Sequence, residues 1–94
     1  MRRYHTRPGV VLTTVDEQYL LVASKSAREF CPYITQINDT AAFCWRLLED
    51  GADPDALLEH LAEEYEIDDP ERVRTDLQEL LDQLCKANYL IDHS

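Results

Sequence analysis

Residues 37–51 read INDTAAFCWRLLEDG, and at this stretch the periodicity of the chain changes from strand-like to helical. Asn38 is a good N-cap, and apolar residues follow it at helical spacing: Ala41, Cys44, Trp45 and Leu48. Gly51 suits the position just past the end of a helix. The stretch predicts a helix with a broad apolar surface, which must lie centrally in the fold or at an interface.

Two further helices are predicted after this one. Asp53-Pro54 pairs an N-cap with a proline at the first helical position and opens a helix to about Tyr65. Asp69-Pro70 repeats the pattern and opens a helix to about Ala87. Residues 89–91 are then expected to return to the core as a short extended tail. The apolar seam of the last helix is predicted to be core, and it consists of Val73, Leu77, Leu80 and Leu84.

Upstream of residue 37, the pattern is that of strands. Residues 10–15 and 19–23 are apolar and rich in strand-forming side chains, and the polar residues 16–18 between them predict a hairpin. Residues 30–37 predict a third strand. Pro32 cannot donate to a ladder, so this strand is an edge strand or begins after Pro32. We therefore expect an α+β, winged-helix-like fold, with a three-stranded antiparallel sheet followed by three helices.

The length and charge of the chain limit the classes of function that it can have. The chain has 94 residues and 10.9 kDa, which predicts a single domain over residues 1–94. Its net charge is −10, but residues 1–36 carry +2 and residues 37–94 carry −12, with sixteen acids against four bases. A nucleic-acid partner would be repelled by the second part. No apolar run approaches the roughly 20 residues of a membrane helix, so we expect no membrane partner and a cytoplasmic location.

Catalytic, metal and cofactor motifs are missing from the sequence. It contains no Gly-rich phosphate loop, no G-x-S-x-G, no H-E-x-x-H and no paired cysteines. Cys31, Cys44 and Cys85 are odd in number and widely spaced, which indicates reduced thiols that pack in the core. We therefore expect a chain that is not an enzyme and holds no metal or cofactor.

The third strand carries the feature with functional content. Residues 33–37 are free of charge, although natural proteins usually block an exposed sheet edge. The strand is either internal or covered by another part of the fold, or it is open to β-augmentation, in which a peptide adds as a further strand. With Pro32 facing the unpaired side, Ile34 and Gln36 would point their backbone groups outward. The candidate strand residues are Tyr33, Ile34, Thr35, Gln36 and Ile37.

The last helix is expected to form the other wall of such a groove. Beside its apolar seam runs a stripe of mixed polarity, which suits a partly solvated wall better than a dry core. Arg74 could pair with an acidic side chain of a guest peptide, or form a surface ion pair with Asp82 or Glu71. The stripe consists of Arg74, Gln78, Leu81 and Cys85.

With these elements in place, the chain resembles the PqqD-like family. Residues 37–51 resemble that family's Asn-x-Thr-Ala-Ala-x-x-Trp helix signature, and residues 57–67 resemble its second helix. Residues 73–91 resemble its third helix and tail, and Arg7-Pro8-Gly9-Val10 is similar to its opening. Ile37 stands where leucine is usual and Asn88 where glycine is usual. These departures bear on the pathway more than on the fold.

The resemblance implies a RiPP recognition element, a non-catalytic peptide chaperone. Such a domain binds the leader segment of a ribosomally made precursor peptide as an added strand. It then presents the peptide to a modifying enzyme, which is a radical-SAM maturase in pyrroloquinoline-quinone biosynthesis. Carried onto this sequence, the implied groove residues are Tyr33, Ile34, Thr35, Gln36, Ile37, Arg74, Leu77, Gln78, Leu81 and Cys85.

Two other readings stay open. A winged-helix DNA-binding regulator needs a basic last helix, but Arg72 and Arg74 are outnumbered there by the acids Glu71, Asp76, Glu79 and Asp82. A dimerisation module could instead pair its edge strand with a second copy or exchange strands with it. A concentration-dependent mass measurement separates this reading from a monomeric chaperone.

Overall fold

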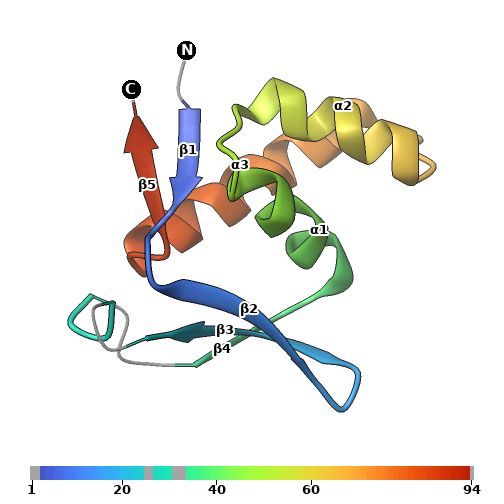
Figure 1. Ribbon diagram of the computed structural model, residues 1–94. Coiled ribbons are helices and arrows are strands. Elements are labelled where there is room, and N and C mark those ends of the chain that lie inside the picture. Colours follow the sequence, from blue (N-terminus) through green and yellow to red (C-terminus); the bar gives the residue numbers. More distant parts are fainter. Residues whose placement is uncertain (1–2, 25–26, 31–33, 94) are drawn as a thin grey trace.

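The computed structural model describes residues 3–24, 27–30 and 34–93 (Figure 1). β2, β3 and β4 form an antiparallel sheet in that order, and the helices lie on one side of it. This arrangement confirms the predicted α+β class with a three-stranded sheet followed by three helices. In chain order the elements are β1 (Arg3–Thr6), β2 (Val10–Val15), β3 (Gln18–Ala23), β4 (Thr35–Ile37), α1 (Asp39–Leu48), α2 (Pro54–Glu64), α3 (Pro70–Lys86) and β5 (Leu90–His93).

The β2–β3 hairpin turns at two residues. Asp16 and Glu17 both have left-handed backbones, with φ of 49° and 65°. Two central residues with positive φ form a type I′ turn, whose twist matches that of the flanking strands. Gln18 therefore belongs to β3 and not to the link, which is one residue shorter than predicted.

The hairpin register determines which backbone groups face β4. Beyond the last pair of the hairpin, the Ser24 N–H donates to the Gly9 carbonyl at 2.7 Å. Because hydrogen-bonded and non-hydrogen-bonded pairs alternate along an antiparallel ladder, the even-numbered residues of β3 bond to β2. Its odd-numbered residues Tyr19 and Leu21 therefore present their backbone groups to β4.

The helix starts were predicted correctly. Asn38, Asp53 and Asp69 each accept a hydrogen bond from the backbone N–H three residues further on, at 2.8, 2.8 and 3.3 Å. Pro54 and Pro70 occupy the first helical positions of α2 and α3. The Asn38 cap lies between the end of β4 and the start of α1, so it fixes the angle at which the chain leaves the edge strand.

The predicted third strand is shorter in the structure than in the sequence analysis. Phe30 lies in a turn, and its N–H donates to the Ala27 carbonyl at 3.0 Å. Its amide is therefore engaged in the turn and does not enter a ladder. β4 begins only at Thr35. Residues 31–33, including Pro32, lie outside the described part of the chain.

A second, two-stranded sheet was not predicted. β1 and β5 pair antiparallel, with Tyr4 opposite Asp92 and Thr6 opposite Leu90. Tyr4 also exchanges two backbone hydrogen bonds with Ala52, at 2.8 and 2.9 Å. The predicted extended tail is thus confirmed, and its strand partner is the N-terminal segment.

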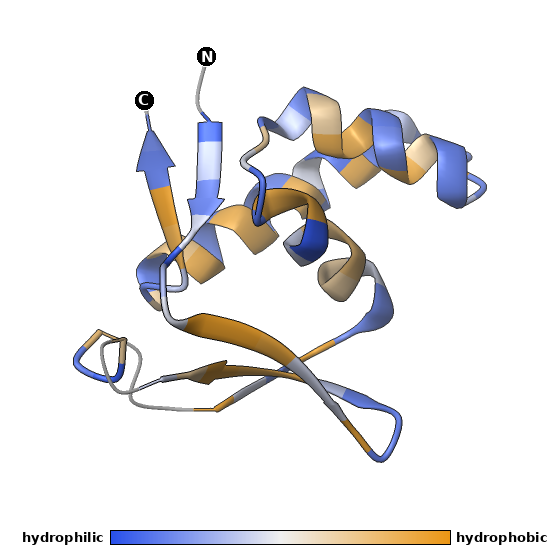
Figure 2. Ribbon diagram, viewed as in Figure 1, coloured by the Kyte–Doolittle hydropathy of each residue, from blue (hydrophilic) through white to orange (hydrophobic). Residues whose placement is uncertain are grey.

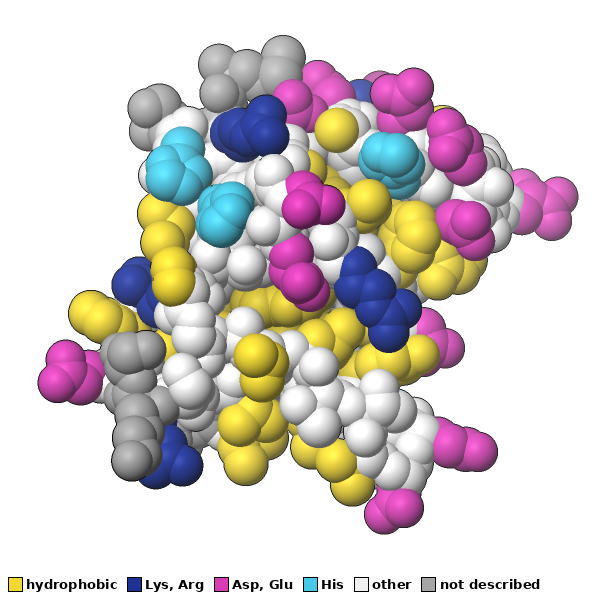
Figure 3. All heavy atoms as spheres, viewed as in Figure 1, with side chains coloured by type: hydrophobic (Ala, Val, Ile, Leu, Met, Phe, Trp, Pro, Cys, Tyr) yellow, Lys and Arg dark blue, Asp and Glu magenta, His cyan; other side chains and the backbone are white. Residues whose placement is uncertain are grey.

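The core lies between the three-stranded sheet and the helices, where the apolar faces meet (Figure 2). Trp45 and Leu48 of α1 and Leu21 of β3 are fully buried in it. In the space-filling view, carboxylates gather over the helices at the upper right of the molecule (Figure 3). Over the described residues, we find no helix with the length and hydropathy needed to cross a membrane.

Candidate functional site

The outer edge of β4 pairs with no described strand, because β4 is the last strand of its sheet. Tyr19 and Leu21 of β3 pair with Ile37 and Thr35, so the ladder hydrogen bonds belong to those two residues of β4. Gln36 therefore points its N–H and C=O away from the sheet, as predicted. The C-terminal tail does not pair with this edge, since β5 pairs with β1.

A cleft of about 270 Å³ runs beside this edge, and we name it the edge cleft. One side is β4 and its junction with α1, and the other is the C-terminal half of α3. An unpaired strand edge beside an apolar helical wall is the geometry that accepts an added strand: backbone groups hold the guest, and the wall receives its side chains. The lining residues are Thr35, Gln36, Ile37, Asn38, Ala41, Leu80, Gln83, Leu84, Ala87 and Tyr89.

Contacts from Arg7 and from the residues just after α3 brace the cleft and the turn before β4. Tyr89 is buried, and its hydroxyl shares a hydrogen bond of 2.7 Å with Thr35 Oγ1. The Arg7 guanidinium lies 4.4 Å from the centre of the Phe30 ring, and its Nε donates to the Asn88 carbonyl at 2.6 Å. Asn88 Nδ2 donates to the Phe30 carbonyl at 3.2 Å. These contacts hold the approach to the edge strand at a fixed distance from α3.

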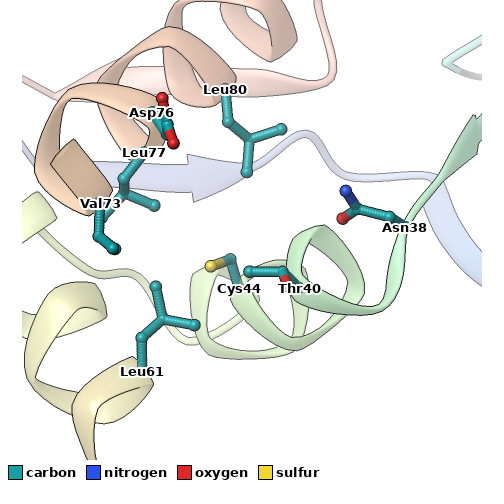
Figure 4. A pocket seen from close by; sticks show the side chains of 8 residues that line it. All are labelled: Asn38, Thr40, Cys44, Leu61, Val73, Asp76, Leu77 and Leu80. Carbon is teal, nitrogen blue, oxygen red and sulfur yellow. The ribbon is translucent and has the colours of Figure 1, made fainter. Parts of the chain in front are cut away.

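A second hollow of about 330 Å³ adjoins the edge cleft, and we name it the inter-helix pocket (Figure 4). It shares Asn38 and Leu80 with the edge cleft. The side chains of Leu61 and Leu80 point into it from α2 and α3. Its walls are mainly apolar, with polar groups from α1 and α3. The lining residues are Asn38, Thr40, Cys44, Leu61, Val73, Asp76, Leu77 and Leu80.

Cys44 contributes a thiol to this pocket, and this thiol acts as an apolar packing group and not as a reactive one. Burial raises the pKa of Cys44 to about 11. The thiol is therefore protonated at neutral pH, and a protonated thiol is a poor nucleophile and a poor metal ligand. In the described part of the chain, His, Cys, Asp and Glu side chains form no group of three that could hold a metal ion.

The stripe of α3 predicted as the groove wall does not line the edge cleft. Gln78 Nε2 donates to the Tyr4 hydroxyl at 3.2 Å and to Asp82 at 3.1 Å. Leu81 is fully buried, and Cys85 lines a separate hollow together with Tyr4. The reason is the pairing of β1 with β5, which was not predicted: β5 contacts α3, and Tyr4 of β1 reaches Gln78 on this face.

Two more predicted groove residues of α3 also lie away from the edge cleft. Arg74 forms an ion pair with Asp55 of α2, and not with Asp82 or Glu71. Leu77 lines the inter-helix pocket and is almost completely buried. The helical side of the edge cleft is instead formed by the predicted core seam, because Leu80 and Leu84 both line it.

The predicted strand residues, unlike those of α3, lie at the edge cleft. Thr35, Gln36 and Ile37 line the edge cleft. Ile34 immediately precedes β4 and is 65% exposed, while Tyr33 lies outside the described residues. Whether these residues bind a peptide remains a prediction. The cleft residues that were not predicted as groove residues are Asn38, Ala41, Leu80, Gln83, Leu84, Ala87 and Tyr89.

Comparison with known proteins gives a family and two solved structures. Residues 32–90 match the family described as coenzyme PQQ synthesis protein D (PqqD). One similar structure, described as lasso peptide synthetase B1 complexed with the leader peptide, is 25% identical, with a TM-score of 0.72 over 94% of this chain and 96% of that one. Another, TbiB1 in complex with the TbiA(beta) leader peptide, is 21% identical, with a TM-score of 0.75 over 96% and 98%. None of the curated proteins matches the sequence.

Proposed function

The chain belongs to the PqqD family, and we propose that it binds the leader segment of a ribosomally synthesised precursor peptide as an added strand on β4. The observation that carries this proposal is the unpaired edge of β4 beside the edge cleft. The two similar structures, described as complexes with leader peptides, support it.

The proposed contacts divide into backbone and side-chain groups. Ile34 and Gln36 would exchange backbone hydrogen bonds with the guest, each worth about 0.5–1.5 kcal/mol net. Ordering a flexible leader opposes this gain, so buried side chains must supply much of the affinity. Leu80 and Leu84 would receive the guest's apolar side chains, and Tyr89 would hold Thr35 in place beneath them.

We further propose that the chain is a chaperone and performs no chemistry itself. The edge cleft consists of backbone groups and uncharged side chains, which suit holding a peptide more than reacting with it. A separate modifying enzyme, in this reading a radical-SAM maturase, would act on the rest of the precursor while the leader is held. Because the precursor is made by ribosomes, this work would take place in the cytoplasm.

Two proline variants test the binding edge. Gln36→Pro removes the outward N–H of β4 and leaves the ladder to β3 intact. Thr14→Pro is the matched change on β2, whose outer edge also pairs with no described strand. Thr14 lies opposite Tyr19, whose backbone faces β4, so the Thr14 groups point away from β3 as well.

The probe is a phage-displayed library of random 16-residue peptides, with calorimetry on the peptides that it yields. We expect selected peptides to bind the wild type and Thr14→Pro equally, and Gln36→Pro about tenfold more weakly or worse. Equal binding to all three proteins would place the peptide elsewhere and refute the proposal. A library that yields no binder would also count against it.

The same variants distinguish peptide binding from dimerisation, in which the edge of β4 pairs with a second copy of the chain. Sedimentation of the peptide-free wild type at increasing concentration is expected to show a monomer. A dimer that Gln36→Pro dissociates and Thr14→Pro preserves would mean that a second copy occupies the edge of β4.

A further inference from the structure

The inter-helix pocket continues the edge cleft at Asn38 and Leu80, so a strand added along β4 would reach its mouth. We infer that this pocket receives a lysine or arginine side chain of the guest peptide, with Asp76 as its charged partner. The inference rests on the proposed peptide binding and adds a requirement on the peptide's chemistry. It selects basic leaders over acidic ones.

The pocket combines two kinds of surface that a long basic side chain needs. Leu61, Val73 and Leu80 provide apolar contact from α2 and α3. Asp76 places a carboxylate on the same lining, next to Leu77 on α3. Lysine and arginine bury their aliphatic stems against apolar surface and keep the charged head at a polar rim. A purely aliphatic side chain would leave the carboxylate unused, and an acidic one would be repelled by it.

Asp76 is available for such a partner. Within the described part of the chain, the structure gives its carboxylate neither an ion pair nor a hydrogen bond. Arg74, two residues away, is held by Asp55 of α2. On α3 itself, Arg72 and Glu79 lie about one turn to either side of Asp76 and offset one another in charge.

The charge of the surroundings favours the same occupant. Among the described residues that line the edge cleft and the inter-helix pocket, Asp76 alone is charged. Residues 37–94, which supply most of both linings, carry a net charge of −12, and the carboxylates over the helices are visible in Figure 3. A surface of this sign attracts a basic peptide and repels an acidic one.

Selection from the same peptide library tests the inference. The wild type is expected to enrich peptides with lysine or arginine at one fixed position of the aligned sequences. Asp76→Asn is expected to lose that preference, and Asp76→Arg is expected to replace it by aspartate or glutamate. Asp82→Asn is the matched control, because it removes the same charge from α3 at a residue that contacts Gln78 outside the pocket.

Calorimetry on one selected peptide measures how much the basic side chain contributes to the binding affinity. Replacing its basic residue by glutamine should weaken binding to the wild type about five- to tenfold and leave binding to Asp76→Asn unchanged. Enriched peptides that depend on Gln36 but show no basic preference, or keep it in Asp76→Asn, would overturn this inference and leave the proposed function standing. A library without any binder would overturn both. Asp76 is exposed, and thermal melts confirm that its variants fold.

Discussion

Helix α3 presents two faces to two different parts of the molecule. One face carries Gln78, which donates a hydrogen bond to the Tyr4 hydroxyl of β1, and Leu81, which is fully buried. The other face, with Leu80 and Leu84, lines the edge cleft beside β4. The face of mixed polarity is thus satisfied inside the molecule, and the more apolar face is partly open. An apolar stripe on a helix can belong to a core that is completed only when a partner binds.

The largest effect is expected from a charge on the face of α3 that carries Gln78 and Leu81. Leu81→Asp places a carboxylate in a fully buried site and should lower the free energy of unfolding by about 3 kcal/mol or more. Urea denaturation followed by circular dichroism measures the change. A Leu81→Asp protein as stable as the wild type would mean that this face of α3 is not core.

A charge on the cleft face should spare the fold and abolish binding. Leu80 is only half-buried and lines both hollows, so Leu80→Asp is expected to fold and to lose about a hundredfold in affinity for a selected peptide. Calorimetry measures the loss, with Leu80→Met as the control that keeps the wall apolar. If Leu80→Asp unfolds as readily as Leu81→Asp, the two faces do not differ as described.

The reactivities of two cysteines, Cys44 and Cys85, test the solvent exposure of the two faces of α3. Cys44 lines the inter-helix pocket, and burial raises its pKa from 9.0 to about 11. At pH 8 its thiolate fraction is therefore about a hundredfold below that of an ordinary thiol. Iodoacetamide should alkylate the partly exposed Cys85 before the buried Cys44, as followed by mass spectrometry of tryptic peptides. Faster labelling of Cys44 would show that the pocket opens to solvent more than the structure indicates.

The smallest effect is expected from removing the hydroxyl group of one of two buried tyrosines, Tyr89 or Tyr4. Tyr89 bonds to Thr35 beside the edge cleft, and Tyr4 bonds to Gln78 on the opposite side of α3. Tyr89→Phe and Tyr4→Phe should each lower the free energy of unfolding by about 1 kcal/mol. Only Tyr89→Phe is expected to weaken peptide binding, by about threefold, because Thr35 then loses its brace. If both variants bind a selected peptide with equal affinity, Tyr89 does not contribute to peptide binding.

Short-range features were predictable from the sequence, and long-range pairing was not. The caps at Asn38, Asp53 and Asp69 depend on residues within one helical turn, so local patterns suffice to identify them. The pairing of β1 with β5 joins residues far apart in the sequence, for example Arg3 with His93. No local sequence pattern predicts such a pairing.

The unpredicted strand β1 explains why the predicted helical wall and the observed lining of the edge cleft differ. Without β1, the mixed stripe at Gln78 and Leu81 appeared to be the face left for a partly solvated groove. Leu84 of the predicted core seam is indeed buried and Leu80 packs against the core, and both also line the edge cleft. The strand side was predictable because Pro32 indicated which backbone groups face outward, and alternation along a ladder extends that direction to Gln36. It assigned the outward direction to Gln36 correctly.

Amide hydrogen exchange, resolved by NMR, tests the central claim most directly. The N–H groups of Gln36 and Thr14 both point away from their sheet, at its two opposite edges. With a selected peptide bound at saturation, exchange at Gln36 should slow by about tenfold or more, while exchange at Thr14 stays unchanged. Unchanged exchange at Gln36 in the saturated complex would contradict addition of the peptide to β4.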